Sequence, residues 1–253
     1  MNTHTVKEQL TRLKLGFSAS NLEHVLAKNK KAVSLEWLSE LLELEIDHRK
    51  EKSIQAKIKS AHFPEITSID TFDFAFNPKI NQQKIVDLAS LEFVQENKIA
   101  LFLGNPGTGK THIAIAIGVL AARSGHKVFA TSAKRLTAMI LAARMRGTLD
   151  ELFKKILSAK LWIIDDWGMV SFQKDVSEEV FDLLDRRRFS SAMILTSNRD
   201  VDEWPQVFHE PVLASAAIDR IFDNADITIF QGPSYRLKGR IKIKDVDSLK
   251  TDH

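Results

Sequence analysis

The chain has 253 residues, no cysteine, a hydrophobic share of 44%, a charged share of 27% and a formal net charge of +3. This is the composition of a globular protein with one substantial core, and it excludes disulfide-stabilised scaffolds and thiolate metal sites. No apolar run reaches the ~20 residues of a membrane span and the N-terminus has no signal-peptide core, so we expect a cytoplasmic protein with no membrane partner.

The first 60 residues carry leucines at helical spacing, which predicts helices. The segment from Ser34 to Lys59 has acids in its early turns and bases in its later ones, which complements the helix dipole. It is either a solvated helix or a basic arm that docks on nucleic acid or a partner. Because Pro64 ends the helix, we expect residues 1–66 to form a small helical N-terminal domain for partner or DNA contact.

After this break, strands alternate with helices, which is typical of a parallel sheet. An aromatic-rich extended piece over 69–76 either packs in the core or covers an adenine base, and a helix over 82–96 leads into the first strand. We expect five strands, over residues 99–103, 127–131, 161–166, 192–196 and 226–230. The prediction is an α/β fold with a five-stranded parallel sheet flanked by helices. Gly147 and Thr148 divide residues 133–157 into two helices.

The first strand runs directly into the sequence GNPGTGKT, which fits the pattern G-x-x-x-x-G-K-[ST] and precedes an apolar helical segment. Strand, loop and helix in this order predict a phosphate-binding loop, in which glycines let backbone N–H groups converge on a triphosphate. Lys110 is expected to reach the β- and γ-phosphates, and the Thr111 hydroxyl to ligate Mg²⁺. The residues expected to bind ATP or GTP are Gly104, Asn105, Pro106, Gly107, Thr108, Gly109, Lys110, Thr111 and His112.

Acidic and polar side chains end the third and fourth strands. Asp165 is expected to hold Mg²⁺, directly or through water, and Asp166 to accept a proton from the attacking water. Asn198 either positions that water or merely begins a turn. Arg220 lies in an apolar helical stretch and is either an arginine finger for a neighbouring subunit's γ-phosphate or a structural arginine paired with a nearby aspartate. The residues alone leave both alternatives open.

Basic residues are concentrated in the helical segment 133–157 and in the tail that begins at Arg236. No zinc-finger, helix-turn-helix or RNA-recognition signature accompanies them, which favours contacts to the phosphate backbone over the reading of bases. A third cluster, residues 186–188, is interpreted as a helix end stabilised by cations. The candidate DNA-binding residues are Lys134, Arg135, Arg144, Arg146, Lys154, Lys155, Arg236, Lys238 and Arg240.

Several blocks resemble the IstB-like ATP-binding proteins of insertion sequences and their relative, the DnaC helicase loader. They read IALFLGNPGTGKTHIAIA, LWIIDDWG, ILTSN and EWPQVFHEPVLASAAIDRIFDNADITIFQGPSYRLK. With the lead-in FDFAFNPKINQQKIVDLASLEFV, the similarity covers residues 67–238. The resemblance implies an AAA+ ATPase, with strand order 5-1-4-3-2, that assembles with ATP on double-stranded DNA and activates a transposase.

Carried over residue by residue, the resemblance assigns Lys110 and Thr111 to Walker A, Asp165 and Asp166 to Walker B, Asn198 to sensor 1 and Arg220 to the arginine finger. A finger that acts in trans implies a homo-oligomer, either a ring or an open helix. The resemblance places the AAA+ domain at 67–235, followed by a basic tail at 236–253. Arg236 falls near a sensor 2 position, but too few residues follow it for a full helical lid. Residues 133–157 resemble the helical element by which initiator-type relatives line a DNA channel.

Asp166 departs from the glutamate that the family usually has. Its side chain is one methylene shorter, and a misplacement of ~1 Å in a catalytic group can cost ~10²-fold in rate. We therefore expect slow hydrolysis, with ATP acting mainly as an assembly switch. Two alternatives stay open: a DnaC-type loader of a replicative helicase, and a metabolic P-loop kinase or nucleotide-binding module that is indifferent to DNA and to subunit mixing.

Overall fold

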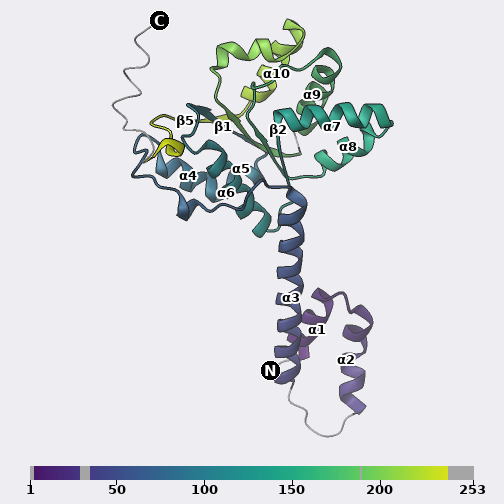
Figure 1. The fold of residues 1–253 in the computed structure, drawn as a ribbon. Coiled ribbons are helices and arrows are strands. Elements are labelled where there is room, and N and C mark those ends of the chain that lie inside the picture. The colour runs from purple at the N-terminus through teal and green to yellow at the C-terminus, as the bar shows by residue number, and fades with distance from the viewer. Residues whose placement is uncertain (1–2, 29–34, 189, 239–253) are drawn as a thin grey trace, which may run out of the picture. The chain divides into compact units, whose positions relative to one another are not determined.

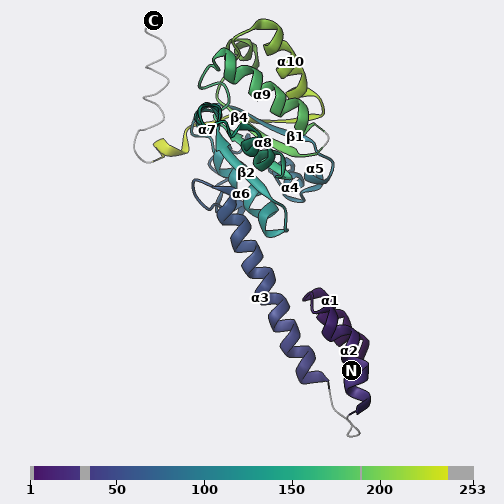
Figure 2. The same cartoon turned by 90° about the vertical axis from the view of Figure 1, so that its right-hand side faces the viewer.

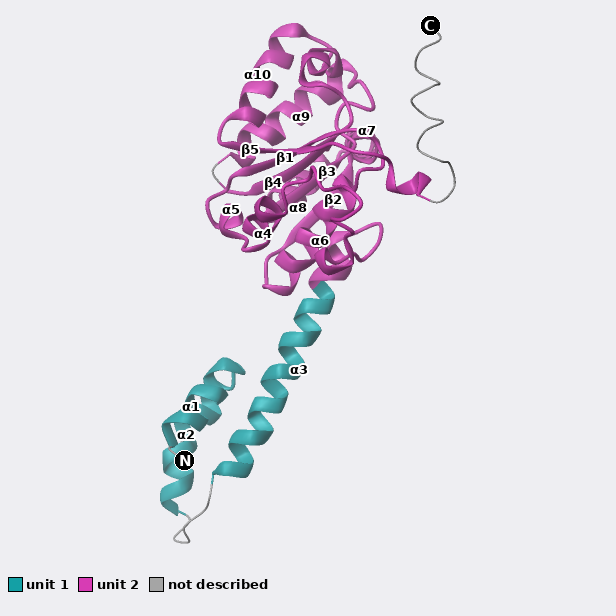
Figure 3. Cartoon of the chain, turned by 90° about the vertical axis from the view of Figure 1, so that its left-hand side faces the viewer, with its two compact units in different colours: residues 1–56 teal, residues 57–253 magenta. Residues whose placement is uncertain are grey.

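The computed structural model describes residues 3–28, 35–188 and 190–238 (Figure 1). The chain divides into two compact units, residues 1–56 and residues 57–253 (Figure 3). Helix α3 (Glu36–Ala61) contributes to both. Arg240, one of the candidate DNA-binding residues, lies outside the described residues. No helix in the part of the chain that is described is long and apolar enough to cross a membrane.

The first unit is helical, as its leucine spacing predicts. It contains α1 (Thr3–Arg12), α2 (Gly16–Lys28) and the greater part of α3. Its core consists of Val6, Leu10, Leu13, Ala19, Leu22, Leu35, Leu42 and Ile46. Two polar side chains are buried within it: Gln9 Nε2 donates to the Ser39 carbonyl over 3.2 Å, and Ser39 Oγ donates to Gln9 Oε1 over 3.0 Å. This reciprocal pair fixes α1 against α3.

The second unit is built on a five-stranded parallel sheet. Its strands are β1 (Ile99–Gly104), β2 (Val128–Ser132), β3 (Leu161–Asp165), β4 (Ala192–Ser197) and β5 (Ala225–Phe230). They lie in the order β2-β3-β4-β1-β5 and pair in parallel throughout, which confirms the predicted fold and strand order. The four strands from β1 to β4 are covered on both faces, which is why they are apolar almost without interruption.

Helices cover both faces of this sheet (Figures 1 and 2). On one face pack α4 (Gln82–Ala89), α5 (Glu92–Gln95) and α6 (Lys110–Arg123). On the other pack α7 (Ala133–Arg146), α8 (Leu149–Leu157), α9 (Lys174–Arg187) and α10 (Pro211–Phe222). Successive strand residues alternate between the two layers: Leu101 belongs to the second, Phe102 to the first.

The helix boundaries follow local backbone chemistry. Gly147, with φ +67°, ends α7, so the predicted division into two helices is confirmed. The single helix predicted over 82–96 is wrong: Leu91 adopts a left-handed conformation at φ +64° and separates α4 from α5. The piece predicted as extended over 69–76 is also wrong, because it begins with the 3₁₀ turn η1 (Ile69–Thr71) and continues through turns.

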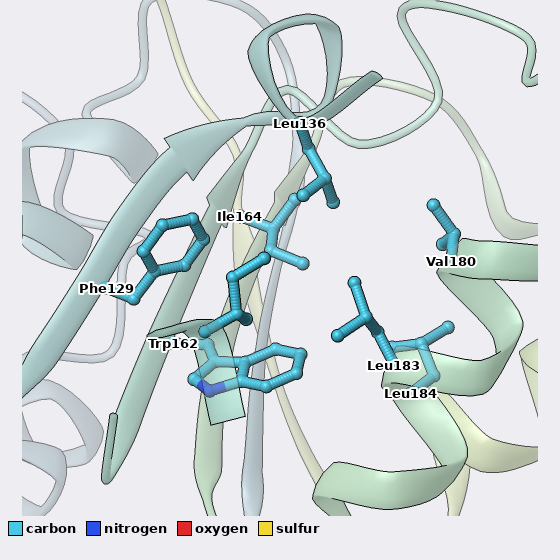
Figure 4. A pocket seen from close by; sticks show the side chains of 8 residues that line it. Phe129, Leu136, Trp162, Ile164, Val180, Leu183 and Leu184 are labelled. Atoms are coloured by element: carbon cyan, nitrogen blue, oxygen red, sulfur yellow. The ribbon is translucent and has the colours of Figure 1, made fainter. Parts of the chain in front are cut away.

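A cavity of about 10 Å³ lies between the sheet and helices α7 to α9 (Figure 4). Its walls are Phe129, Leu136, Ile156, Trp162, Ile164, Val180, Leu183 and Leu184. The cavity is at most the size of one water molecule and its lining is apolar apart from the indole N–H of Trp162. It is therefore a packing defect and offers no room for a substrate.

Candidate active site

The loop after β1 takes the shape that its glycines permit. Gly107 and Gly109 have φ values of +75° and +101°, where a side chain is strained. They are also crowded: a Cβ at Gly107 would lie 2.1 Å from Ser234 Oγ, and one at Gly109 would lie 2.2 Å from Phe72 Cε2. Two glycines are thus required both by backbone conformation and by segments that pack directly on the loop.

Lys110 is buried at the first turn of α6, with 5% of its surface exposed. Its Nζ donates to the carbonyls of Gly104 and Asn105, each over 2.7 Å. Burial lowers the pKa of Lys110 to about 8, although the charges of Asp165 and Asp166 raise it. A buried ammonium on a tight glycine loop fits the β- and γ-phosphates of a nucleotide, which would replace the two carbonyls as its partners.

Asp165, at the end of β3, receives two hydroxyl hydrogen bonds on one oxygen. Thr111 Oγ1 donates to Asp165 Oδ1 over 2.8 Å, and Thr196 Oγ1 donates to the same oxygen over 2.5 Å. The described residues include no group of three or more His, Cys, Asp or Glu side chains that could hold a metal ion. The hydroxyl–carboxylate pair fits Mg²⁺ nonetheless, because this ion usually takes one or two protein ligands together with waters and substrate phosphates.

Asp166 occupies the next position in a left-handed conformation, at φ +55°. Its backbone N–H donates to Thr196 Oγ1 over 3.1 Å, and Asn198 Nδ2 donates to Asp166 Oδ1 over 3.3 Å. Burial raises the pKa of Asp166, and so does the charge of Asp165. A carboxylate with a raised pKa is a stronger base, which suits proton acceptance from water. The structure thus brings Lys110, Asp165, Asp166 and Asn198 to one site.

A segment from Gly232 to Lys238, which we call the strap, lies against the phosphate loop. The Tyr235 backbone N–H donates to the Gly107 carbonyl over 2.8 Å. Asn77 Nδ2 lies 3.4 Å from the Thr108 carbonyl and 3.5 Å from the Pro233 carbonyl, so this buried amide joins loop and strap. Asn77 was not predicted as a site residue. The feature of the sequence that points to it is the Asn-Pro pair, which is typical of turns.

The end of the strap is fastened by an ion pair. Lys238 Nζ donates to Asp73 Oδ2 over 2.7 Å and lies 5.1 Å and 4.8 Å from the ring centroids of Phe76 and Tyr235. Lys238 is a candidate DNA-binding residue, and here its ammonium is engaged by a carboxylate and two rings. Arg236, another candidate, is close enough for its charge to add to the lowering of the Lys110 pKa and to oppose in part the rise of the Asp166 pKa.

The aromatic piece before the loop serves more than one purpose. Phe72 and Phe74 pack against the core layer of α6, which matches the first alternative for residues 69–76. Phe76 instead meets Tyr235 of the strap, with ring centroids 5.1 Å apart. His112, one of the expected nucleotide contacts, is engaged on this side, since its Nε2 lies 3.0 Å from the Ser68 carbonyl.

Arg220, near the end of α10, is paired within its own chain. Its Nε donates to Asp185 Oδ1 over 2.8 Å, and its Nη1 donates to Asp219 Oδ2 over 3.1 Å. These partners raise the pKa of Arg220, so it stays charged. The sequence reading anticipated a neighbouring aspartate but not Asp185, which belongs to α9.

The candidate DNA-binding residues of α7 and α8 are exposed. One of them, Arg144, is also ion-paired: its Nη1 lies 3.0 Å from Glu179 Oε1 on α9. Burial lowers the pKa of His62, the residue that follows α3, and the charges of Lys155 and Arg135 lower it further.

Comparison with known families and proteins gives a consistent result. The model of the family described as IstB-like ATP binding protein matches residues 8–243. An ATP-binding protein of insertion sequence IS21 from Pseudomonas aeruginosa is 33% identical over 241 residues, 94% of this chain and 91% of the relative. The IS232 counterpart from Bacillus thuringiensis subsp. berliner is 34% identical, over 90% of this chain and 92% of the relative.

Solved structures share the fold. The DnaC helicase loader superposes with a TM-score of 0.55 and 18% identity, over 65% of this chain and 97% of the loader. AMPPCP-bound DnaA from Aquifex aeolicus gives a TM-score of 0.56 and 19% identity, over 74% of this chain and 60% of DnaA. Similarity at this level of identity shows a shared fold alone.

Proposed function

Because this chain belongs to the family of IstB-like ATP-binding proteins, we propose that it is an AAA+ ATPase that binds DNA, oligomerises on it and activates a transposase. Its relatives are ATP-binding proteins of insertion sequences, which supports a transposase as the protein partner. We assign partner or DNA contact to residues 1–66, ATP hydrolysis to residues 67–235 and a further DNA contact to the basic tail, residues 236–253.

One observation carries the ATPase proposal. The hydroxyl of Thr111, at the start of the helix after the phosphate loop, is hydrogen-bonded to Asp165 at the end of β3. A phosphate loop and a strand-end carboxylate joined in this way form the two halves of a Mg²⁺–nucleotide site. Mg²⁺ bound there would neutralise charge on the β- and γ-phosphates.

The chain's own residues then have distinct tasks. Lys110 binds the β- and γ-phosphates, and Thr111 and Asp165 hold the magnesium ion. Asp166 accepts the proton of the attacking water, and Asn198, which is hydrogen-bonded to Asp166, keeps that carboxylate in position. Hydrolysis is slow because the aspartate carboxylate reaches less far than a glutamate would.

Arg220 is proposed to act on the nucleotide of a neighbouring subunit. Its partners Asp185 and Asp219 hold it on the α9–α10 side of the chain, so it would have to exchange these ion pairs for the γ-phosphate of the next subunit. The phosphates of double-stranded DNA would contact the exposed lysine and arginine side chains of α7 and α8.

The alternative of a helicase loader rests on the same ATPase architecture, and the N-terminal helices would select the partner. Pull-down with residues 1–66 against a transposase and a replicative helicase separates the two. The metabolic kinase alternative needs a pocket for a phosphate acceptor. The cavity of Figure 4 is too small and too apolar to serve as one, and a second cavity of about 470 Å³ is lined by residues of the first unit and by none of the phosphate loop.

The test is sedimentation of the full chain with ATP, with and without duplex DNA, at low and high salt. A large assembly that needs both ligands and dissociates as salt rises supports the proposal, since phosphate contacts are salt-sensitive. Arg220→Ala should abolish the assembly and leave nucleotide binding by the monomer intact. If the wild-type chain sediments as a monomer with and without ATP and duplex DNA, the assembly proposal is overturned and the metabolic alternative is favoured.

A further inference from the structure

Thr196 connects the two acids of the site through a single hydroxyl group. It lies near the end of β4, with 1% of its surface exposed. Its Oγ1 donates to Asp165 Oδ1 over 2.5 Å and accepts the backbone N–H of Asp166 over 3.1 Å. In the sheet, β4 lies between β3, which ends at Asp165, and β1, which leads into the phosphate loop.

The first of these bonds restrains the Asp165 carboxylate. Thr111 at the start of α6 and Thr196 near the end of β4 both donate to Oδ1, so the carboxylate is held from two elements at once. Hydrogen bonds from a hydroxyl to an ionised carboxylate are short and about twice as strong as neutral ones. Loss of the Thr196 bond would leave the carboxylate with the hydroxyl of Thr111, at the start of α6, as its remaining hydroxyl partner.

The second bond restrains the backbone of Asp166. A residue with a side chain at φ +55° is in a sparsely populated conformation, which persists only where the surroundings hold it. The N–H of Asp166 is bound by Thr196, and its carboxylate by Asn198. The direction of the Asp166 side chain therefore depends on the same hydroxyl that orients Asp165.

We propose that Thr196 is a positioning residue of the ATPase reaction, which sets the magnesium-holding carboxylate and the water-activating carboxylate together. This inference rests on the proposed function. It predicts that the Thr196 hydroxyl matters for the magnesium-dependent part of nucleotide binding and not for the contact between Lys110 and the phosphates.

The neighbouring residue provides a matched control. Ser197 is equally buried, and its Oγ donates to the Trp167 carbonyl over 2.9 Å, which is a backbone contact outside the two carboxylates. Ser197→Ala thus removes a buried hydroxyl one residue away. Thr196→Val removes the Thr196 hydroxyl at nearly constant volume, and Thr196→Ser retains it.

The experiment measures binding of a fluorescent ATP analogue to the full chain, first in EDTA and then over a Mg²⁺ titration. For Thr196→Val we expect the Mg²⁺ concentration at half-maximal effect to rise ~10- to 100-fold, the cost typical of removing a group that orients a metal ligand. Its affinity in EDTA should stay at the wild-type value. Thr196→Ser and Ser197→Ala should both need wild-type Mg²⁺ concentrations.

The inference is overturned if the half-maximal Mg²⁺ concentration of Thr196→Val equals that of the wild type. It is also overturned if Ser197→Ala raises this concentration as much as Thr196→Val does. Thr196→Ala provides a second variant without the hydroxyl. If neither hydroxyl-free variant folds while Ser197→Ala does, Thr196 is structural and the inference fails. A wild-type chain that binds Mg²⁺–nucleotide but never hydrolyses it, with or without DNA, refutes the proposed ATPase function, whereas the Mg²⁺ titration still tests whether Thr196 positions the carboxylate that holds the ion.

Discussion

Raising the pH from 7 to 9 should weaken nucleotide binding about tenfold, because it removes the proton from Lys110. Burial lowers the pKa of this lysine to about 8 in the chain without nucleotide. Phosphate attracts the ammonium and not the neutral amine, so affinity follows the protonated fraction, about 0.9 at pH 7 and about 0.1 at pH 9. The resulting loss of binding free energy is about 1.4 kcal/mol.

Anisotropy titrations of a fluorescent ATP analogue in EDTA, at constant ionic strength, measure this profile. Lys110→Arg is the control: a guanidinium stays charged throughout, so its affinity should not change between pH 7 and 9. A flat wild-type profile, or an equal decline in Lys110→Arg, would refute the reasoning.

The same shift predicts the opposite sign for stability. Between pH 8 and 10.5 the unfolded chain holds the Lys110 proton and the folded chain has lost it, so this group makes the free energy of unfolding increase with pH. Denaturant unfolding of the nucleotide-free wild type, compared with Lys110→Met, measures that contribution.

Three further predictions have defined outcomes. Asp166→Glu should raise ATP turnover, by up to ~10²-fold, and turnover no faster than the wild type would contradict the short-carboxylate argument. Replacing Lys154 and Lys155 by alanine should weaken binding to duplex DNA of any sequence. It should also reduce the magnitude of the negative slope of log affinity against log salt concentration by about two. Arg144→Ala, which removes an arginine that is ion-paired to Glu179, should change the magnitude of this slope by less than the value of about one expected for an unpaired cation, and a change of about one would contradict this reasoning. Gly107→Ala should lower the melting temperature in calorimetry, because the added Cβ meets the strap at a positive φ of +75°; an unchanged temperature would show that the strap yields.

Local patterns were sufficient for most of the fold. Five apolar runs predict five strands because each central strand is buried on both faces. Gly147 marks the end of α7 because a glycine readily adopts a left-handed conformation. The break at Leu91 has no such signal, since leucine is rarely found at φ +64°; here the side chain is buried in the core and the backbone N–H donates to the Leu88 carbonyl.

The site was predictable where its residues are neighbours in sequence or end adjacent strands. Lys110 and Asp165 follow from a loop pattern and a strand end. The partners of Lys238 and Arg220 do not, because Asp73 lies 165 residues before Lys238 and Asp185 belongs to another helix. Thr196 is the last residue of the predicted strand 192–196, and only the three-dimensional arrangement reveals that its hydroxyl meets the carboxylate of Asp165 and the backbone N–H of Asp166.

In the chain without nucleotide, the carbonyls of Gly104 and Asn105 accept hydrogen bonds from the Lys110 ammonium and so compete with nucleotide phosphates for it. A nucleotide must displace two short hydrogen bonds, from Gly104 and Asn105, before the ammonium is available to it. A triphosphate offers enough negative charge and enough acceptor oxygens to compensate for both, whereas a monophosphate offers few of either. We therefore expect a nucleoside triphosphate to bind to the loop more tightly than a monophosphate.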